Sequence, residues 1–435
     1  MSMFKIIESV QAYAASDPAR FHMPGHKGRL GMFAEASVLD LTELEVSDDL
    51  YAPKSGFADA LDIMTDFYGT KATVISAHGA TLPIFAAVYL YSKENRPFLC
   101  SRKVHRSVIN ALAVCGCGVR FIPDTGDGIE LSALEAALSD PDYSGLILTS
   151  ADYYGRLEDL SPVIEKCKRA DLPVIADNSH GSHLFFDGSN AHPLRLGANA
   201  VIDSYHKTLP TMTGGALLHT MDFDRGRVLD AFRLFASTSP SYVISLSVLS
   251  AFELMKNDGC RRLSQLRETV AETTNVLKKL GMGVASFARS DPYRFCTECA
   301  GSAAQYSSFL SKRGVVCEFC DDTYTVFIPS VMNNAADFGR LIEATREFTA
   351  THEIKPAVRP PRYLHIPEPA VSIRSAVFSD KETIGSELAE GRIAAEELSP
   401  YPPGIPLIIP GERIDKCVIS ALISAGFDKI KVMAR

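Results

Sequence analysis

The segment DSYHKTLP, residues 203–210, decides the fold because it sets a lysine between two short apolar runs. Residues 198–202 (ANAVI) predict one buried strand, and residues 216–220 (ALLHT), which follow a Gly-Gly pair, predict a second. Lysine is seldom buried unless it is paired or hydrogen-bonded. Lys207 therefore indicates either a surface lysine at a strand end or an amine that forms a Schiff base with the aldehyde cofactor pyridoxal 5'-phosphate (PLP).

A second residue favours the cofactor. Residues 172–176 (LPVIA) predict a strand that ends at Asp177. In an open α/β sheet, ligands bind outside the carboxyl ends of the strands. PLP also needs a carboxylate beside its pyridine nitrogen, because only the protonated ring is a good electron sink. Asp177 could instead cap a helix or a turn, but that role leaves its pairing with Lys207 unexplained.

The phosphate of such a cofactor needs a third feature. Residues 71–92 predict a strand, a tight turn and a helix. Gly79 lets the backbone approach a ligand closely, while Ala80 and Thr81 open the helix. Free N–H groups and the helix dipole form an anion site at such a helix start. We therefore expect the phosphate at this turn.

Composition is ordinary for a globular enzyme. The chain has 435 residues, enough for two domains of unequal size, with 46% hydrophobic and 22% charged residues. A net charge of −8 with scattered basic residues disfavours nucleic acid or an anionic membrane as a partner. Residues 1–16 predict an amphipathic helix and not a signal peptide, and the longest apolar run, residues 82–91, is too short to cross a bilayer. We expect a cytoplasmic protein.

Ten cysteines are too few for a disulfide framework in a chain of this length. Two CxxC pairs, Cys296 with Cys299 and Cys317 with Cys320, have a spacing that fits structural zinc. The alternative is that the pairs lie in strands, because residues 314–330 predict two strands around an Asp-Asp turn. Neither pair has the glycine typical of a zinc knuckle. We therefore expect buried thiols and no metal.

The first half of the chain alternates apolar strands with amphipathic helices. This alternation predicts a mostly parallel, helix-covered sheet, and the lack of a complete Rossmann fingerprint after the first strand disfavours a dinucleotide fold. The seven expected strands are residues 72–77, 98–101, 119–122, 145–150, 172–176, 198–202 and 215–220. The helices expected around them are residues 57–69, 104–114, 131–139 and 159–170.

The second half predicts a smaller α+β unit. Residues 242–281 have a helical pattern in two stretches that meet at Gly259, and residues 284–350 follow the order strand, helix, strand, strand, helix. The tail predicts, in order, an extended proline-rich connection, a helix and a loop dense in proline and glycine, at residues 352–371, near 380–391 and at 399–412.

Taken together, these features resemble the PLP-dependent ornithine/lysine/arginine decarboxylase family of the aspartate-aminotransferase fold (fold type I), in its short bacterial form without an extra N-terminal wing domain. The resemblance runs nearly end to end, and its lysine segment and its C-terminal segment are the most specific parts. The pieces that carry it are FHMPGHKG (21–28), DLTELEVSDDL (40–50), HGAT (78–81), VHRSV (104–108), YYG (153–155), DNSHGSHL (177–184), SYHKTLP (204–210), STSP (237–240) and GRIAAEELSPYPPGIPLIIPGE (391–412).

The resemblance implies a large domain with a seven-stranded, mostly parallel sheet and a smaller α+β C-terminal domain. It implies loss of CO2 from a basic L-amino acid (lysine, ornithine or arginine), giving an amine that belongs to polyamine metabolism. The implied division is an N-terminal helix and arm, a PLP-binding large domain, linking helices with a small α+β domain, and a decarboxylase-type tail, at residues 1–50, 51–245, 246–350 and 351–435.

The same resemblance gives roles around the cofactor ring. Lys207 would be the Schiff-base lysine, and Asp177 would pair with the pyridine nitrogen. His105 would stack on one ring face, and Ser179, where the family usually has alanine, would lie against the other. His206 would position the substrate or handle protons. Simpler roles stay open, since His105 could cap a helix and Ser179 could satisfy local backbone.

Further residues would hold the phosphate. Ala80, Thr81 and Ser204 would bind it within one chain, although Ser204 could instead satisfy local backbone. Ser237 and Thr238 would reach the phosphate of a neighbouring subunit, so the resemblance implies a homodimer, or a higher homo-oligomer, with shared active sites.

Three residues depart from the family pattern: Asn178 in place of glutamate, Asp152 in place of a small hydroxyl residue, and Gly214 in place of glutamine. They put the choice of substrate, and to a lesser extent turnover, in doubt. Two rival functions stay open. One is another PLP reaction such as transamination, with Arg374 as a carboxylate clamp by position only. The other is a weakly catalytic PLP-binding regulator.

Overall fold

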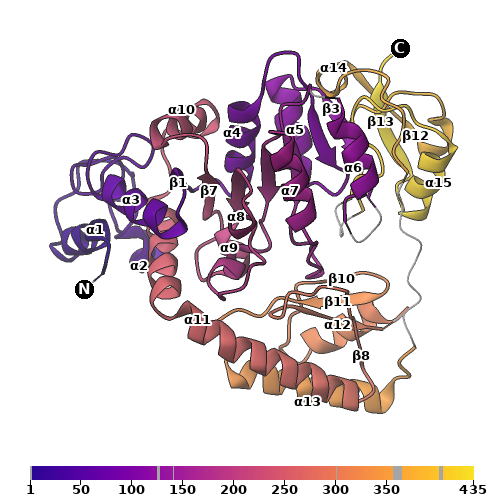
Figure 1. Cartoon of the computed structure of the whole chain (residues 1–435). Helices are drawn as coiled ribbons and strands as arrows, with labels where there is room; N and C mark the ends of the chain where they lie inside the picture. The colour runs from indigo at the N-terminus through magenta and orange to yellow at the C-terminus, as the bar shows by residue number, and fades with distance from the viewer. Residues whose placement is uncertain (1, 125–127, 141, 300, 356–364, 401–404) are drawn as a thin grey trace.

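The computed structural model describes residues 2–124, 128–140, 142–299, 301–355, 365–400 and 405–435. Along these residues a large α/β domain is followed by a small α+β domain and a C-terminal α+β unit (Figure 1). The two chain ends lie on opposite sides of the molecule (Figure 1). The connection expected at residues 352–371 and the loop expected at 399–412 fall in part on residues 356–364 and 401–404, which lie outside the described residues.

A seven-stranded sheet forms the centre of the large domain, in the order β1-β7-β6-β5-β4-β2-β3. Every pairing is parallel except the two made by β7, which runs antiparallel to β1 and β6. The connection from β6 to β7 contains only the single helical turn at Tyr205–Thr208 and no crossover helix, and β7 returns antiparallel beside β6. The seven expected strands are confirmed as β1 (Ala72–Ser76), β2 (Phe98–Ser101), β3 (Val119–Ile122), β4 (Leu146–Thr149), β5 (Val174–Asp177), β6 (Ala200–Asp203) and β7 (Ala216–Thr220).

Both faces of this sheet are covered, as expected for a mainly parallel sheet. In β5, Ile175 packs into the core on one face, whereas Val174 and Ala176 pack into the core on the other. One core includes helices α3 (Gly56–Tyr68), α4 (Thr81–Tyr91), α5 (Arg106–Cys115) and α10 (Arg225–Phe235). The other includes α6 (Leu131–Leu138) and α7 (Ser161–Arg169). The helices expected between the strands are therefore confirmed.

One helix, α11 (Tyr242–Lys279), runs from the large domain to the small domain (Figure 1). The two expected stretches are one helix that continues through Gly259. A Cβ atom at Gly259 would lie 3.0 Å from Cε of Met255 and 3.3 Å from Cβ of Phe186. The glycine therefore allows close packing against Phe186 and does not end the helix.

The small domain contains a four-stranded antiparallel sheet in the order β10-β11-β9-β8. Its helix α13 lies along α11 (Figure 1) and begins with a capping box made by Asn334 and Asp337. The expected order of strands and helices holds with one correction: two strands, β8 and β9, and not one precede the first helix. The turn at Asp321-Asp322 lies between β10 and β11 as expected. The elements are β8 (Gly283–Val284), β9 (Phe295–Glu298), α12 (Ala303–Ser311), β10 (Phe319–Cys320), β11 (Tyr324–Phe327) and α13 (Ala335–Thr351).

The helix expected near residues 380–391 is wrong. Residues Lys381–Gly385 form strand β12, followed by a 3-10 turn at Ser386–Leu388. β12 pairs antiparallel with β13 (Lys429–Met433) at the far end of the unit. The local composition does not reveal this partner, and cross-strand packing overrides a weak local propensity. The remaining helices of the unit are α14 (Ile373–Val377) and α15 (Lys416–Ser424).

A buried ion pair joins the C-terminal unit to the large domain. Arg102, which follows β2, donates from Nη1 and Nη2 to the two carboxylate oxygens of Glu412 at 2.6 and 2.9 Å. Its Nε donates to the carbonyl of Pro406 at 3.2 Å. Arg374 on α14 makes a second contact, because its Nη1 donates to two carbonyls at the carboxyl end of α5. Arg374 therefore holds the C-terminal unit against the large domain.

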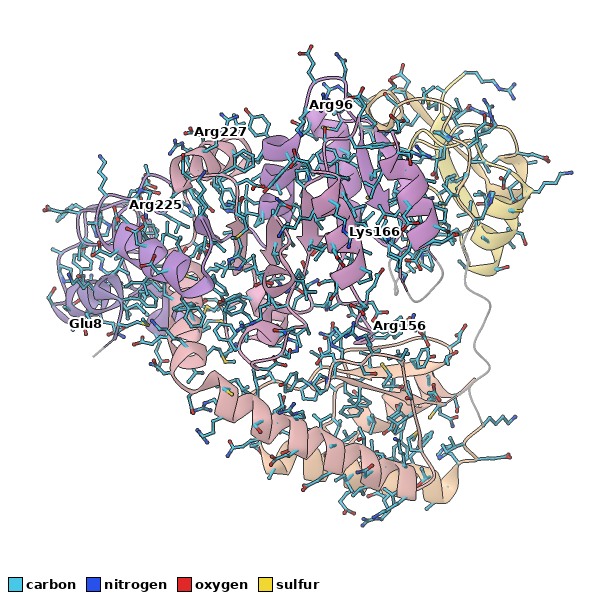
Figure 2. All side chains as sticks on the ribbon, viewed as in Figure 1. Glu8, Arg96, Arg156, Lys166, Arg225 and Arg227 are labelled. Atoms are coloured by element: carbon cyan, nitrogen blue, oxygen red, sulfur yellow. The ribbon has the colours of Figure 1, made fainter. Side chains whose placement is uncertain are left out.

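The N-terminal region packs against the opposite end of the large domain and consists of α1 (Lys5–Ala15), a 3-10 turn at Gly31–Phe33 and α2 (Ala34–Ser37). Charged side chains such as Glu8, Arg96 and Arg227 point outward from the molecule (Figure 2). Across the described ranges, no helix is both long and apolar enough to cross a membrane.

Candidate active site

Lys207 lies in α9 (Tyr205–Thr208), a single helical turn between β6 and β7. Backbone hydrogen bonds fix this turn, with the N–H of His206 donating to Gly215 O at 3.2 Å and that of Leu209 to Tyr205 O at 2.8 Å. The fully buried Tyr205 hydroxyl bonds the hydroxyl of Tyr68 on α3. The Lys207 side chain is exposed. A rigid turn therefore presents this amine at the open edge of the sheet.

His180 and Arg294 surround the amine of Lys207. His180 Nε2 lies 3.1 Å from Lys207 Nζ, and Arg294 Nη1 lies 3.3 Å from His180 Nδ1. A guanidinium group only donates hydrogen bonds, so His180 Nδ1 accepts and the ring proton sits on Nε2. Nε2–H then donates to Lys207, whose amine accepts only when it is unprotonated.

Electrostatics favour these same protonation states. Desolvation lowers the pKa of Lys207 although its side chain reaches solvent; Asp177 and Glu318 raise this pKa, and Arg294 lowers it further. The pKa of His180 lies well below its usual value because of burial and of the charges on Lys207 and Arg294. A neutral imidazole thus faces an amine that gives up its proton more readily than an ordinary lysine.

Asp177 ends β5 and is paired in register with Ile202 of β6. Asp177 and Lys207 therefore come from the carboxyl ends of adjacent strands. The Asp177 side chain is buried, and its Oδ1 accepts hydrogen bonds from the Ser179 backbone N–H at 3.1 Å and the Ser179 hydroxyl at 2.5 Å. Among the described residues none donates to Oδ2, so that oxygen is available to a ligand. Ser179 thus does satisfy a local group, the Asp177 carboxylate.

His105 has the capping role considered as its simpler alternative, and it also lies near the strand ends. It is the N-cap of α5, with its Nδ1 accepting from the Ser107 backbone at 3.2 Å and from the Ser107 hydroxyl at 2.7 Å. Burial lowers the pKa of His105, the Asp177 carboxylate raises it, and Lys207 lowers it. The cap therefore orients an imidazole that is electrostatically coupled to both Asp177 and Lys207.

The turn before α4 has the geometry of an anion site. Gly79 has φ +68°, its N–H donates to Gly214 O at 2.7 Å, and its carbonyl accepts from the Ser76 hydroxyl at 2.9 Å. These bonds fix the backbone just before Ala80 and Thr81, where the first N–H groups of a helix have no intrahelical acceptor. The turn can therefore hold a phosphate without rearrangement.

Ser204 and His206 adjoin this turn through the β6–β7 connection. His206 Nδ1 donates to Gly215 O at 3.1 Å and lies 3.3 Å from the buried hydroxyl of Ser204. Its proton is therefore on Nδ1, and burial lowers the pKa of the ring. Ser237 and Thr238 are exposed between α10 and α11, and no described contact brings them to Lys207 or to the Gly79 turn.

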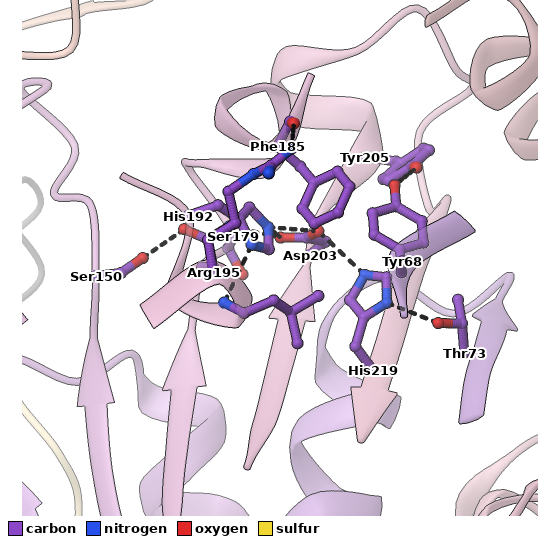
Figure 3. A network of polar contacts seen from close by, with 12 residues as sticks. Tyr68, Thr73, Ser150, Ser179, Phe185, His192, Arg195, Asp203, Tyr205 and His219 are labelled. Atoms are coloured by element: carbon purple, nitrogen blue, oxygen red, sulfur yellow. Dashed lines mark hydrogen bonds and ion pairs between the residues drawn. The ribbon is translucent and has the colours of Figure 1, made fainter. Parts of the chain in front are cut away.

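A buried polar network lies directly under the two strand ends (Figure 3). Asp203 accepts from Asn178 Nδ2 at 2.6 Å and from the Nε2 atoms of His192 and His219, each at 3.1 Å. The Ser150 hydroxyl donates to the amide oxygen of Asn178. Burial alone would raise the pKa of Asp203, but the two histidines outweigh it and the net pKa is lowered. The network fixes the residues that flank Asp177 and Ser204.

The fold and this geometry agree with comparisons to known proteins. A family profile described as the Orn/Lys/Arg decarboxylase major domain matches residues 5–289, and one for the C-terminal domain of that family matches residues 361–425. The chain belongs to the Orn/Lys/Arg decarboxylase family.

Individual relatives cover almost the whole chain. An arginine decarboxylase of Bacillus subtilis (strain 168) is 28% identical over 461 residues, which cover 94% of this chain and 91% of the relative. The uncharacterized protein YaaO of the same organism is 28% identical over 440 residues, which cover 93% and 90%. The solved structure of lysine decarboxylase A from Pseudomonas aeruginosa has a TM-score of 0.82 at 19% identity, covering 97% of this chain and 75% of that one. The fold is therefore that of the fold type I decarboxylases.

The structure gives physical reasons for the three departures from the family pattern. A glutamate in place of Asn178 would set a second carboxylate against Asp203. Asp152 closes the YYG turn, because its Oδ1 accepts from the N–H groups of Tyr154 and Arg156 at 2.9 and 2.8 Å. Gly214 has φ +105°, a conformation that disfavours any side chain.

Several residues of this site escape sequence reasoning. His180 and His183 lie inside the DNSHGSHL motif, yet their partners Arg294 and Asp291 lie in the small domain. His183 Nε2 lies 3.1 Å from Asp291 Oδ2, and both side chains are buried. No periodicity links positions so far apart. The only available signal was the unexplained pair of histidines in the motif.

The adjacent tyrosines of the YYG motif also contact the small domain. The Tyr153 hydroxyl donates to Glu318 Oε1, and the Tyr154 hydroxyl donates to Asp321 Oδ2 at 2.8 Å. Arg156 lies in the same region between the two domains (Figure 2), with its guanidinium over the ring of Phe287. The loop after β4 is therefore a principal contact between the domains.

Three of the four cysteines of the CxxC pairs contact different partners. Cys296 Sγ donates to Tyr154 O at 3.3 Å, Cys299 Sγ lies 3.1 Å from the Met282 sulfur, and Cys317 Sγ lies 3.1 Å from the Ser307 hydroxyl. Burial raises the pKa of Cys299 to about 11. Within the described residues, no group of three or more His, Cys, Asp or Glu side chains is arranged to hold a metal ion.

Proposed function

We propose that this protein is a PLP-dependent decarboxylase of a basic L-amino acid. The observation that carries the proposal is the placement of Lys207 and Asp177 at the carboxyl ends of adjacent strands, with the Gly79 turn at the end of β1. The site fits the cofactor: an open amine, a buried carboxylate with one available oxygen, and a preformed anion turn. When bound, PLP would supply an electron sink for the electron pair of the bond that breaks as CO2 leaves the substrate.

The chain's own residues would hold and tune that cofactor. Lys207 would bond to its aldehyde carbon, and Asp177 Oδ2 would keep the ring nitrogen protonated. The N–H groups at Ala80 and Thr81, with the Ser204 hydroxyl, would bind its phosphate. His105, held by its cap, would pack on one ring face, and Ser179, engaged with Asp177, would present its Cβ to the other.

The proposed proton donor is the Lys207 amine or a neighbouring imidazole. His180 Nε2 is 3.1 Å from Lys207 Nζ, whereas the Nδ1 proton of His206 is directed to Gly215 O. Return of a proton to the substrate α-carbon is therefore better supported from Lys207 with His180 than from His206.

The proposed active unit is a homodimer. Ser237 and Thr238 are exposed, and no described contact joins them to the strand ends of their own chain. This exposure supports a role for them at the phosphate of a second subunit, as the family resemblance implies. The site would then be complete only in the dimer.

A substrate panel tests the function. Purified protein with added PLP is incubated with lysine, ornithine and arginine, and amine products are identified by mass spectrometry alongside released CO2. The expected result is one main amine with an equal amount of CO2. Formation of a keto acid would favour transamination, for which Arg374 is poorly placed because it docks α14 on α5. No turnover of any basic amino acid would contradict the proposal.

A further inference from the structure

A carboxylate of the small domain faces the amine of Lys207 across the site. Glu318 directly precedes β10, the edge strand of the small-domain sheet, and its backbone N–H donates to Val326 O at 3.0 Å. Its side chain is exposed. Glu318 and Asp177 are the carboxylates whose charges act on the Lys207 ammonium group. Asp177 is buried at the strand end, so Glu318 is the acidic group on the open side.

A chain of contacts fixes where Glu318 lies. Lys207 Nζ is 3.1 Å from His180, and the His180 ring packs edge-on against the Tyr153 ring with centroids 5.1 Å apart. The Tyr153 hydroxyl donates to Glu318 Oε1. The Tyr153 ring also packs edge-on against the Phe319 ring, with centroids 5.7 Å apart. Only the Tyr153 side chain thus separates Glu318 from the His180 ring that touches the reactive amine.

The neighbouring pair of Tyr154 and Asp321 shows what a purely structural contact looks like here. Asp321 Oδ1 accepts from the N–H groups of Thr323 and Tyr324 at 2.7 and 2.6 Å, and Oδ2 accepts from the Tyr154 hydroxyl. Both Asp321 oxygens are therefore engaged, and the side chain is half-buried. In contrast, among the described residues no group bonds Glu318 Oε2, and the side chain is open to solvent.

We propose that Glu318 binds the distal cation of the substrate, an ammonium or guanidinium group, while Tyr153 holds the carboxylate in place. This inference rests on the proposed function and names the group that selects a basic side chain. A substrate attached near Lys207 carries its cation on a short flexible chain that projects away from the cofactor. A fixed carboxylate with one unoccupied oxygen, separated from His180 by the Tyr153 side chain alone, matches such a cation in charge and direction.

The test compares two matched substitutions. Glu318→Gln keeps an acceptor for the Tyr153 hydroxyl but removes the charge, and Asp321→Asn makes the same change at the neighbouring tyrosine pair. Each variant, with PLP, is assayed with the best basic substrate and with a neutral analogue of similar length, such as norleucine for lysine or citrulline for arginine. Cofactor absorbance and thermal unfolding are measured on the same preparations.

We expect Glu318→Gln to raise KM for the basic substrate about 10- to 100-fold, with cofactor absorbance unchanged. Its preference for the basic substrate over the neutral analogue should fall by the same factor. Asp321→Asn should leave KM and this preference within about threefold of the wild type, as expected for a contact away from the substrate. Tyr153→Phe should raise KM by a smaller factor than Glu318→Gln, because it loosens the carboxylate without removing it.

Two results would overturn the inference in different ways. If the wild type decarboxylates a basic amino acid and Glu318→Gln keeps its preference over the neutral analogue, Glu318 only joins the two domains and the assignment is wrong. Equal effects of Glu318→Gln and Asp321→Asn would likewise show that Glu318 has no special contact with the substrate. If the wild type acts on no basic amino acid, the proposed function itself fails and this inference fails with it.

Discussion

Arg294 Nη1 lies 3.3 Å from His180 Nδ1, and this contact decides which ring nitrogen turns a proton toward Lys207. Three backbone carbonyls, of Asp152, Tyr153 and His180, accept the other hydrogen bonds of the same guanidinium. Arg294 comes from the small domain, whereas Lys207 belongs to the large domain. The protonation state of the reactive amine therefore depends on how the two domains meet.

The first prediction concerns the uptake of PLP by the cofactor-free protein. An amine attacks an aldehyde only when unprotonated, so the uptake rate should rise with pH through the pKa of Lys207, below the usual value of about 10.4. Arg294 lowers this pKa and Glu318 raises it. The midpoint should therefore move to higher pH in Arg294→Met and to lower pH in Glu318→Gln. Stopped-flow absorbance measures the rate, and Arg346→Met, at an exposed position of α13, is the control. Midpoints that coincide in all four proteins would contradict the assignment.

The second prediction is that Lys207 alone carries the cofactor. Wild-type protein with PLP should absorb in the visible, and Lys207→Ala should not. Borohydride reduction followed by peptide mapping should place the pyridoxyl group on Lys207. Lys103→Ala is the matched control, because Lys103 also follows a strand of the sheet and pairs with Asp124 at 3.0 Å. A pyridoxyl group on any other lysine would show that the site is misplaced.

The third prediction concerns the network of Figure 3. Asp203→Asn replaces the carboxylate that accepts from His192 and His219, so the free energy of unfolding at pH 7 should fall by about 3 kcal/mol. Because the folded-state pKa of Asp203 is lowered, this contribution is present above the unfolded pKa of about 3.9 and is lost as pH falls toward the folded value.

Urea unfolding followed by circular dichroism measures the free energy of unfolding of Asp203→Asn and of the wild type. The exposed Asp230→Asn should change stability by less than about 0.5 kcal/mol. Equal effects of the two variants at pH 7 would refute a stabilising network.

The fourth prediction concerns the buried pair of Arg102 and Glu412. Removing either partner leaves a buried charge unpaired, so Glu412→Gln or Arg102→Met should cost about 3–5 kcal/mol. The double variant Arg102→Met/Glu412→Met should be more stable than Arg102→Met alone or Glu412→Met alone.

A double-mutant cycle in thermal unfolding measures the coupling energy between Arg102 and Glu412. The exposed pair of Lys416 and Glu390, 3.9 Å apart, should show a coupling below about 1 kcal/mol. Additive effects at Arg102 and Glu412 would contradict a coupled pair.

The sequence predicts well those structural features that a local pattern of residues encodes. The strands that lead to Asp177 and to Lys207, the turn at Gly79 and most of the order of the small domain follow from apolar runs, glycines and helical spacing. At two places the structure differs from what the local pattern of residues suggests. The two helical stretches that meet at Gly259 form one helix, in which the glycine packs closely against Phe186. Residues 381–385 form a strand because β13, at the end of the chain, pairs with them.

The rest of the site depends on tertiary contacts that no spacing encodes. Glu318 and Arg294 lie in the small domain and meet His180 and Tyr153 only after the domains pack. No spacing in the sequence points to Glu318 as the group that would read a basic side chain. The predicted roles of Ser237 and Thr238 stay predictions, because they concern a second subunit.

The last prediction separates binding from chemistry at Asp177. Asp177→Asn removes the charge with almost no change of shape, and it leaves an amide oxygen to accept from Ser179. PLP should still bind through Lys207 and the Gly79 turn, so visible absorbance per subunit should stay close to that of the wild type. Decarboxylation should nevertheless fall about a hundredfold or more, comparable to the loss of one preorganised electrostatic group, because the ring nitrogen loses its anionic partner.

The deciding quantity for Asp177→Asn is the ratio of turnover to cofactor occupancy on one preparation. Ser179→Ala is the matched control, because it removes the hydroxyl bonded to Asp177 Oδ1 and leaves the charge in place. Its turnover per bound cofactor should stay within about tenfold of the wild type, since the carboxylate still faces the ring nitrogen. If turnover in Asp177→Asn drops only in proportion to occupancy, Asp177 merely helps to hold the cofactor. If neither quantity changes, Asp177 is a turn residue, and the pairing with Lys207 that underlies the proposed chemistry is mistaken.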